Sequence, residues 1–130
     1  MYQAARVAGG AGQHYRTIDL TSKIEGASPH RLITILYDEL ITALAAAKMA
    51  IVRQDPARLN ENQARASSIV QTLDASLDFD KGGEVARALS AVYREIGRLI
   101  ASGCRSRDVH AIKGAQSLVG EIAGAWGQIG

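Results

Sequence analysis

The chain has 130 residues, of which 47% are hydrophobic, 5% aromatic and 22% charged, with a formal net charge of +2. This length fits one domain, and the apolar content excludes a wholly disordered chain. Many alanines and few aromatic residues favour helices over an all-β fold, the small net charge gives no support to nucleic-acid binding, and a single cysteine excludes an internal disulfide.

The first 26 residues are predicted to form a flexible N-terminal segment, because they contain a glycine-rich stretch at positions 9–12 and no sustained apolar period. No positive cluster followed by an apolar run marks a secretory signal. No stretch of the chain approaches 18 consecutive apolar residues, which argues against membrane insertion. These features predict a cytoplasmic protein.

The first predicted helix begins at Ser28 and Pro29 and runs to about Arg53. Serine is a good N-cap, and proline suits the first helical position. Apolar residues then recur at steps of three and four, which defines one helical face. That face contains Ile33, Tyr37, Leu40, Leu44, Ala47 and Ile51.

Three further helices are predicted. Asp55 and Pro56 repeat the start signal for the second helix, and residues 78–83 end it in a tight turn at Gly82 and Gly83. The third helix ends near Gly103, and Ser106 or Asp108 caps the fourth. Their predicted apolar faces are, in order, Leu59, Ala66, Ile69, Val70, Leu73 and Leu77; Val85, Leu89, Val92, Ile96 and Leu99; and Ile112, Ala115, Val119, Ile122 and Trp126.

The connections between these helices are short, about two, six and four residues. Short connections make consecutive helices antiparallel neighbours. We therefore predict an all-α fold, in which residues 27–130 form an antiparallel, up-down-up-down four-helix bundle preceded by the flexible segment 1–26.

The sequence offers little chemistry for such a bundle. His14, His30 and His110 lack metal-ligand spacing, so we predict no metal or other cofactor. Cys104 is predicted to lie in a loop near two arginines. A thiol activated by these arginines is one interpretation, but no histidine is close in sequence, so an ordinary free thiol is the favoured one. His110 is predicted to face solvent on the fourth helix, in a segment similar to the phosphoacceptor motif of histidine phosphotransfer domains. A phosphotransfer module is therefore the alternative function.

The apolar face of the first helix is wider than a core-facing helix needs. Leu32, Leu36 and Ile41 widen its arc to nearly half of the helix circumference. Packing against two neighbouring helices is one explanation. A surface groove for helices of another protein is a second, and a structural homodimer is a third.

Four motifs in order resemble the flagellin-specific export chaperone family FliS. They are residues 27–33 (ASPHRLI), residues 36–38 (LYD), residues 77–84 (LDFDKGGE) followed by Ala86, Leu89 and Tyr93, and finally Asp108-Val109 with the late Trp126. The resemblance covers most of the chain from Ala27 onward.

This resemblance implies a cytoplasmic, non-enzymatic chaperone. It would bind the disordered C-terminal segment of flagellin, prevent premature filament assembly, and deliver flagellin to the flagellar type III export gate. The predicted flagellin-binding groove contains Leu32, Ile33, Leu36, Tyr37, Leu40, Leu89, Tyr93 and Ile96, some of which must also belong to the core. Tyr37 and Tyr93 are the preferred contacts, because tyrosine keeps a polar tip at a partly wet surface.

The N-terminal segment is a candidate lid for the empty groove. Tyr15, Ile18 and Leu20 are its apolar anchors, and the client would displace them. Deletion of residues 1–26 should then tighten flagellin binding.

Overall fold

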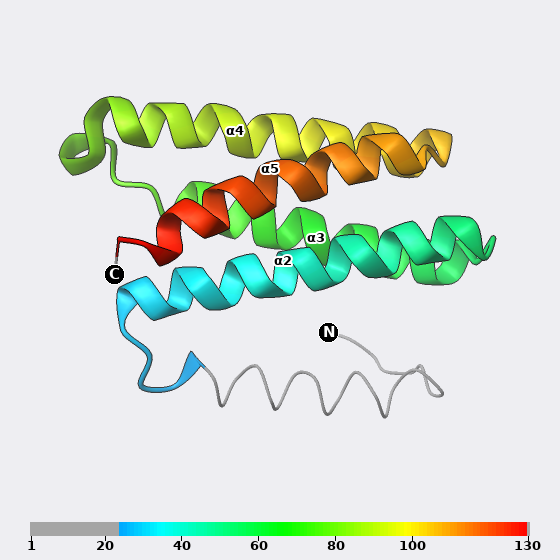
Figure 1. The fold of residues 1–130 in the computed structure, drawn as a ribbon, viewed down its shortest axis with the longest axis horizontal. Helices are drawn as coiled ribbons and strands as arrows, with labels where there is room; N and C mark the ends of the chain where they lie inside the picture. The colour runs from blue at the N-terminus through cyan, green and yellow to red at the C-terminus, as the bar shows by residue number, and fades with distance from the viewer. Residues whose placement is uncertain (1–23, 130) are drawn as a thin grey trace. The chain divides into compact units, whose positions relative to one another are not determined.

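The computed structural model describes residues 24–129, and within them it contains four long helices and no strand (Figure 1). They are α2 (Pro29–Val52), α3 (Pro56–Ala75), α4 (Phe79–Ser106) and α5 (Val109–Gly127). The predicted all-α bundle of four helices is confirmed. The second and third connections, residues 76–78 and 107–108, are shorter than predicted.

Side-chain caps fix the helix starts that the sequence indicated. Ser28 Oγ accepts a hydrogen bond from the Arg31 backbone N–H at 3.1 Å. Asp55 caps α3 by accepting from the backbone N–H of Arg58, also at 3.1 Å. Each cap satisfies an amide that the first helical turn leaves without a partner. Pro29 and Pro56 both stand at the first position of their helices, as predicted.

The start of α4 differs from the prediction, which placed residues 78–83 in a turn. Asp78 Oδ1 accepts from the backbone N–H groups of Asp80 and Lys81, so the helix begins at Phe79. The predicted break is nevertheless present inside it, because Gly83 has φ +53° and ψ −126°. This conformation is open to glycine and strained for other residues. The proposed role of Gly82 and Gly83 in shaping a turn stays a prediction, because both glycines lie inside α4.

The chain divides into two compact units, residues 1–35 and 36–130. The described part of the first unit contains the Ser28 cap and the first two turns of α2. Its side chain at Ile35 is buried, whereas Leu32 and Ile33 are partly exposed. The three predicted lid residues, Tyr15, Ile18 and Leu20, lie outside the described residues.

The second unit contains the packed helices. A Cβ added at Gly103 of α4 would lie 2.8 Å from Ile112 Cδ1 of α5, and one added at Gly114 would lie 3.6 Å from Leu99 Cδ1. Position 103 of α4 therefore faces position 112 of α5, and the earlier position 99 of α4 faces the later position 114 of α5. The two helices are antiparallel. Figure 1 shows the same alternation for the successive helices of this unit.

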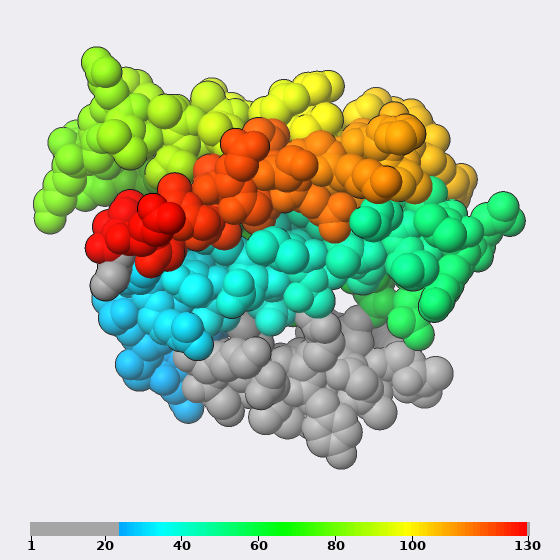
Figure 2. Space-filling model, in the orientation of Figure 1, coloured from blue at the N-terminus to red at the C-terminus, as the bar shows by residue number. Residues whose placement is uncertain are grey.

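The core of the second unit is built mostly from aliphatic side chains and alanine. Its largest fully buried members come from all four helices: Leu40, Leu44, Leu73, Ile96, Ile100, Ile112 and Val119. Buried alanines at Ala43, Ala47, Ala66 and Ala115 let the helices approach closely. On the face shown in Figure 2, α5 lies between α4 and the second-unit part of α2.

Candidate functional site

A pair of tyrosines joins α2 to α4 inside the second unit. The hydroxyl groups of Tyr37 and Tyr93 lie 2.7 Å apart and form a buried hydrogen bond. Each side chain is 2% exposed. The Trp126 ring of α5 meets the Tyr37 ring edge-on, with centroids 6.5 Å apart and an interplanar angle of 84°. Three of the four bundle helices therefore meet at this aromatic cluster.

Burial controls the ionisation of both tyrosines. Desolvation raises the pKa of Tyr37, and the hydrogen bond from Tyr93 opposes part of that shift. Desolvation also raises the pKa of Tyr93, with further increases from Tyr37 and from the charge of Asp74. The prediction that the tyrosine tips lie at a partly wet surface is therefore wrong for this conformation.

The structure separates the eight predicted groove residues into two sets. Tyr37, Leu40, Tyr93 and Ile96 are buried in the core. Leu32, Ile33, Leu36 and Leu89 are partly exposed. Only this second set reaches solvent, and within it Leu36 and Leu89 belong to the second unit.

The buried face of α4 is rotated relative to the predicted one. The prediction used Val85, Leu89, Val92, Ile96 and Leu99, whereas the buried residues are Ala86, Ser90, Tyr93, Ile96, Ile100, Gly103 and Cys104. Small and polar residues at these core positions concealed the true face. Val85 is 70% exposed as a result.

A hydrogen bond accounts for the buried serine in that face. Ser90 Oγ donates to Asp74 Oδ1 of α3 at 2.8 Å. The bond satisfies a hydroxyl that would otherwise lose water without a replacement partner. It also ties α3 to α4. An apolar-periodicity argument misses such a residue because it counts serine as solvent-facing.

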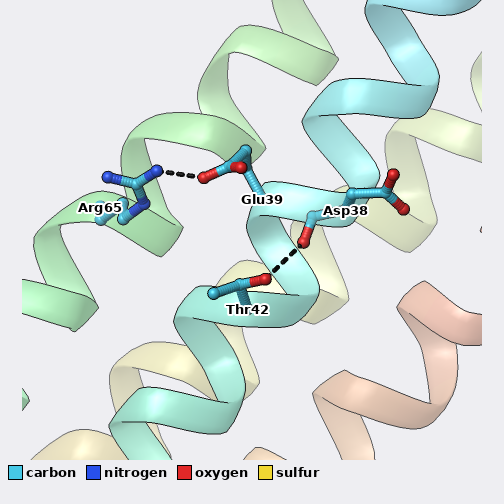
Figure 3. Close-up of polar contacts among 4 residues, drawn as sticks. All are labelled: Asp38, Glu39, Thr42 and Arg65. Atoms are coloured by element: carbon cyan, nitrogen blue, oxygen red, sulfur yellow. Dashed lines mark hydrogen bonds and ion pairs between the residues drawn. The ribbon is translucent and has the colours of Figure 1, made fainter. Parts of the chain in front are cut away.

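A second polar link joins α2 to α3. The Arg65 guanidinium pairs with the Glu39 carboxylate, and both side chains are partly buried (Figure 3). One turn further along α2, Thr42 Oγ1 donates to the Asp38 carbonyl at 3.0 Å. Arg65 Nε is buried and has no partner among the described residues. The sequence analysis did not identify this ion pair, because Glu39 and Arg65 lie 26 residues apart.

The residues that suggested chemistry are placed differently. Cys104 lies in the last turns of α4, which corrects its predicted position in a loop. Burial raises the pKa of its thiol, which favours an ordinary buried thiol over one activated by the arginines. His110 is exposed on the first turn of α5, as predicted. Among residues 24–129, no group of three or more His, Cys, Asp or Glu side chains has the geometry to hold a metal ion.

The second unit exposes an apolar strip on α4. Val85, Leu89 and Val92 follow one another at steps of four and three, so they share one helical face, and all three reach solvent. In the part of the chain that the structure describes, no helix is long and apolar enough to cross a membrane. Apolar side chains in a row on the outside of a helix offer a surface against which an amphipathic helix of a partner protein can pack.

Comparison with known proteins identifies the family. Residues 11–130 match the model of the family described as flagellar protein FliS. The chain is 34% identical over 116 residues to the flagellar secretion chaperone FliS of Salmonella typhimurium (strain LT2), covering 88% of this chain and 86% of that protein. It is 28% identical over 115 residues to FliS of Escherichia coli (strain K12), covering 88% and 85%. The chain therefore belongs to the FliS family, which is a family of chaperones and not of enzymes.

A third relative matches over a shorter range. FliS of Campylobacter jejuni is 41% identical over 70 residues, covering 53% of this chain and 55% of that protein. None of these relatives bears the name of a phosphotransfer protein, so the alternative based on His110 gains no support from them.

Proposed function

We propose that this chain is a cytoplasmic export chaperone for flagellin. It binds the disordered C-terminal segment of flagellin, prevents filament assembly before export, and delivers its client to the flagellar type III export apparatus. The observation that carries the proposal is the family match over residues 11–130 together with relatives named as flagellar secretion chaperones.

The apolar strip on α4 is the part of the second unit that we assign to the client. Val85, Leu89 and Val92 span about 10 Å along the helix at 1.5 Å per residue. Apolar side chains at this spacing fit a partner helix laid along the strip. Of the residues predicted from the family resemblance, Leu89 lies on this strip, and partly exposed Leu36 of α2 offers a further contact.

The entropy cost of ordering a disordered client favours binding over a broad surface of the bundle. A disordered segment loses conformational entropy when it becomes helical, and this loss offsets part of the contact energy. Several shallow apolar contacts distributed over the bundle supply the remainder. Such binding also covers the apolar side chains through which flagellin subunits would otherwise associate.

We further propose that the N-terminal segment competes with the client. Tyr15, Ile18 and Leu20 are its proposed anchors. Deleting residues 1–26 would remove the competitor, so the truncated chain is expected to bind flagellin more tightly. An unchanged or weaker affinity would contradict this part of the proposal.

Calorimetry with a synthetic C-terminal segment of flagellin from the same organism tests the assigned surface. The double variant Val85→Ser, Leu89→Ser is expected to weaken binding at least about tenfold, because it removes two apolar contacts. Val52→Ser is the matched control, since Val52 is 63% exposed at the far end of α2. Equal weakening by the control would contradict the assignment to α4, and no binding by the unaltered chain would contradict the proposed function.

A further inference from the structure

Burial ends abruptly halfway along α5. The buried residues of this helix are Ile112, Ala115 and Val119, all in its first eleven residues. From Gly120 to Gly127 no side chain is buried, although Ile122 and Trp126 are partly covered. We call residues 120–127 the α5 arm. In Figure 2 these last turns of the helix lie on the face toward the viewer.

The arm contains three glycines that packing does not require. A Cβ placed on Gly120, Gly124 or Gly127 would meet no atom within 4 Å, and none of the three has a positive φ. Alanine would therefore fit at each position. Glycine in a helix favours the unfolded chain by roughly fivefold in equilibrium constant relative to alanine. The three glycines thus lower the helix propensity of the arm.

The end of the arm also lacks the stabilising features found at the end of α4. The last turn of α4 contains Arg105, and Arg107 closes that helix in a left-handed conformation with its N–H bonded to the Gly103 carbonyl. The last turn of α5 has no basic residue, and its C-cap, Gln128, keeps a right-handed conformation. Burial, composition and capping all make this end of α5 the weaker one.

We propose that the α5 arm opens from the bundle and that the surface it uncovers on α2, centred on Tyr37, binds an apolar helix of the client. This inference rests on the proposed chaperone function. Trp126 contacts the Tyr37 ring edge-on, so opening removes a cover from the aromatic pair that α2 forms with Tyr93 of α4. The arm thereby acts as a built-in occupant of a client site.

The present occupant indicates which client segment fits. The arm offers Ile122 and Trp126, two large apolar residues four positions apart on the side of α5 that contains its buried residues. A client helix with a large apolar pair at the same spacing would replace them. This site explains how Tyr37 and Tyr93, which the family resemblance places in the groove, become accessible although both are buried here.

Hydrogen exchange of the full chain tests the opening without any client. Backbone amides of the arm are expected to exchange at least tenfold faster than those of residues 112–119. The double variant Gly120→Ala, Gly124→Ala should slow exchange in the arm by about 30-fold, the combined effect of two substitutions. Gly97→Ala on α4 is the matched control, since its Cβ also meets no atom within 4 Å, and it should leave the exchange rate of the arm itself unchanged. Uniform exchange along α5 in the unaltered chain would overturn the proposal.

Calorimetry with the synthetic flagellin segment then tests the role of opening. Binding to an arm-open state is weakened in proportion to the population of that state. The double glycine variant should therefore bind up to about 30-fold more weakly, and Gly97→Ala should bind like the unaltered chain. Equal affinity for all three proteins would overturn the client site beneath the arm and leave the proposed function standing. Absence of binding by all three would instead contradict the proposed function, while the exchange experiment would still decide whether the arm opens.

Discussion

Replacing either member of the Tyr37–Tyr93 pair by phenylalanine is expected to destabilise the bundle more than replacing both. The two hydroxyls are 2.7 Å apart and buried between α2 and α4. A single Tyr→Phe change removes one partner and leaves the other hydroxyl buried without this bond. The double change removes both polar groups and keeps both rings.

The magnitudes follow from the cost of an unsatisfied buried hydroxyl. Each single variant should lose about 1–2 kcal/mol of unfolding free energy, because an orphaned buried polar group costs about 1–3 kcal/mol. The double variant should lose less than about 1 kcal/mol, since apolar replacement of both partners is nearly neutral. The loss in the double variant is therefore expected to be smaller than the sum of the two single losses by more than about 1 kcal/mol, which is the coupling between the two substitutions.

Urea unfolding followed by far-ultraviolet circular dichroism measures this coupling. With an m-value of about 1.5 kcal/mol/M, each single variant should lower the midpoint by about 1 M. Circular dichroism is preferred to fluorescence, because the sole tryptophan packs against Tyr37. A double variant whose loss equals the sum of the two single losses would refute the hydrogen-bonded pair.

Three further predictions concern the same unit. The pKa values of Tyr37 and Tyr93 are raised above 10.0 in the folded chain, so it retains protons that the unfolded chain releases. The contribution of these two tyrosines to stability should therefore be constant below about pH 10 and fall at higher pH. In alkaline unfolding above about pH 10, the Tyr37→Phe, Tyr93→Phe variant should lose stability less steeply than the unaltered chain. In thermal unfolding, Gly83→Ala should destabilise the bundle by about 1–2 kcal/mol because Gly83 has a positive φ. Gly97→Ala should stabilise it by up to about 1 kcal/mol, because a Cβ at position 97 meets no atom within 4 Å. The same shift in both variants would contradict this explanation. Burial raises the pKa of Cys104, so a maleimide reagent at neutral pH should label it only on unfolding, and rapid labelling of the native chain would count against its burial.

Local sequence signals predict the helices well because the relevant interactions are local. The caps at Ser28 and Asp55 act within three residues of their partners. The prolines at positions 29 and 56 follow them directly. Short-range chemistry of this kind can be read without knowing what the helix packs against. The break at Gly83 was predicted for the same reason.

The face of α4 could not be predicted as well, because it depends on partners distant in sequence. Ser90 is buried through its bond to Asp74 of α3, and Tyr93 through its bond to Tyr37 of α2. Neither bond leaves a periodic signal within α4. Val85 and Val92 were therefore assigned to the core on hydropathy alone, although both are exposed to solvent at least in part.

The candidate site was found only in outline. Family motifs pointed to Tyr37, Leu89 and Tyr93 as a group, but only Leu89 reaches the surface. Motif resemblance does not separate a residue that contacts a client from one that packs inside the bundle, because burial depends on neighbours that are distant in sequence. The glycines of the last helix can be read from the sequence, but only the structure shows that Gly120, Gly124 and Gly127 have open space around them.

Isothermal titration of the full chain with the C-terminal segment of flagellin from the same organism tests the central claim most directly. The account predicts a stoichiometric complex with a negative change in heat capacity, because apolar surface is buried when the segment folds on the bundle. It also predicts a gain of helical circular dichroism over the sum of the free components. Absence of binding to every flagellin of that organism would contradict the proposed function.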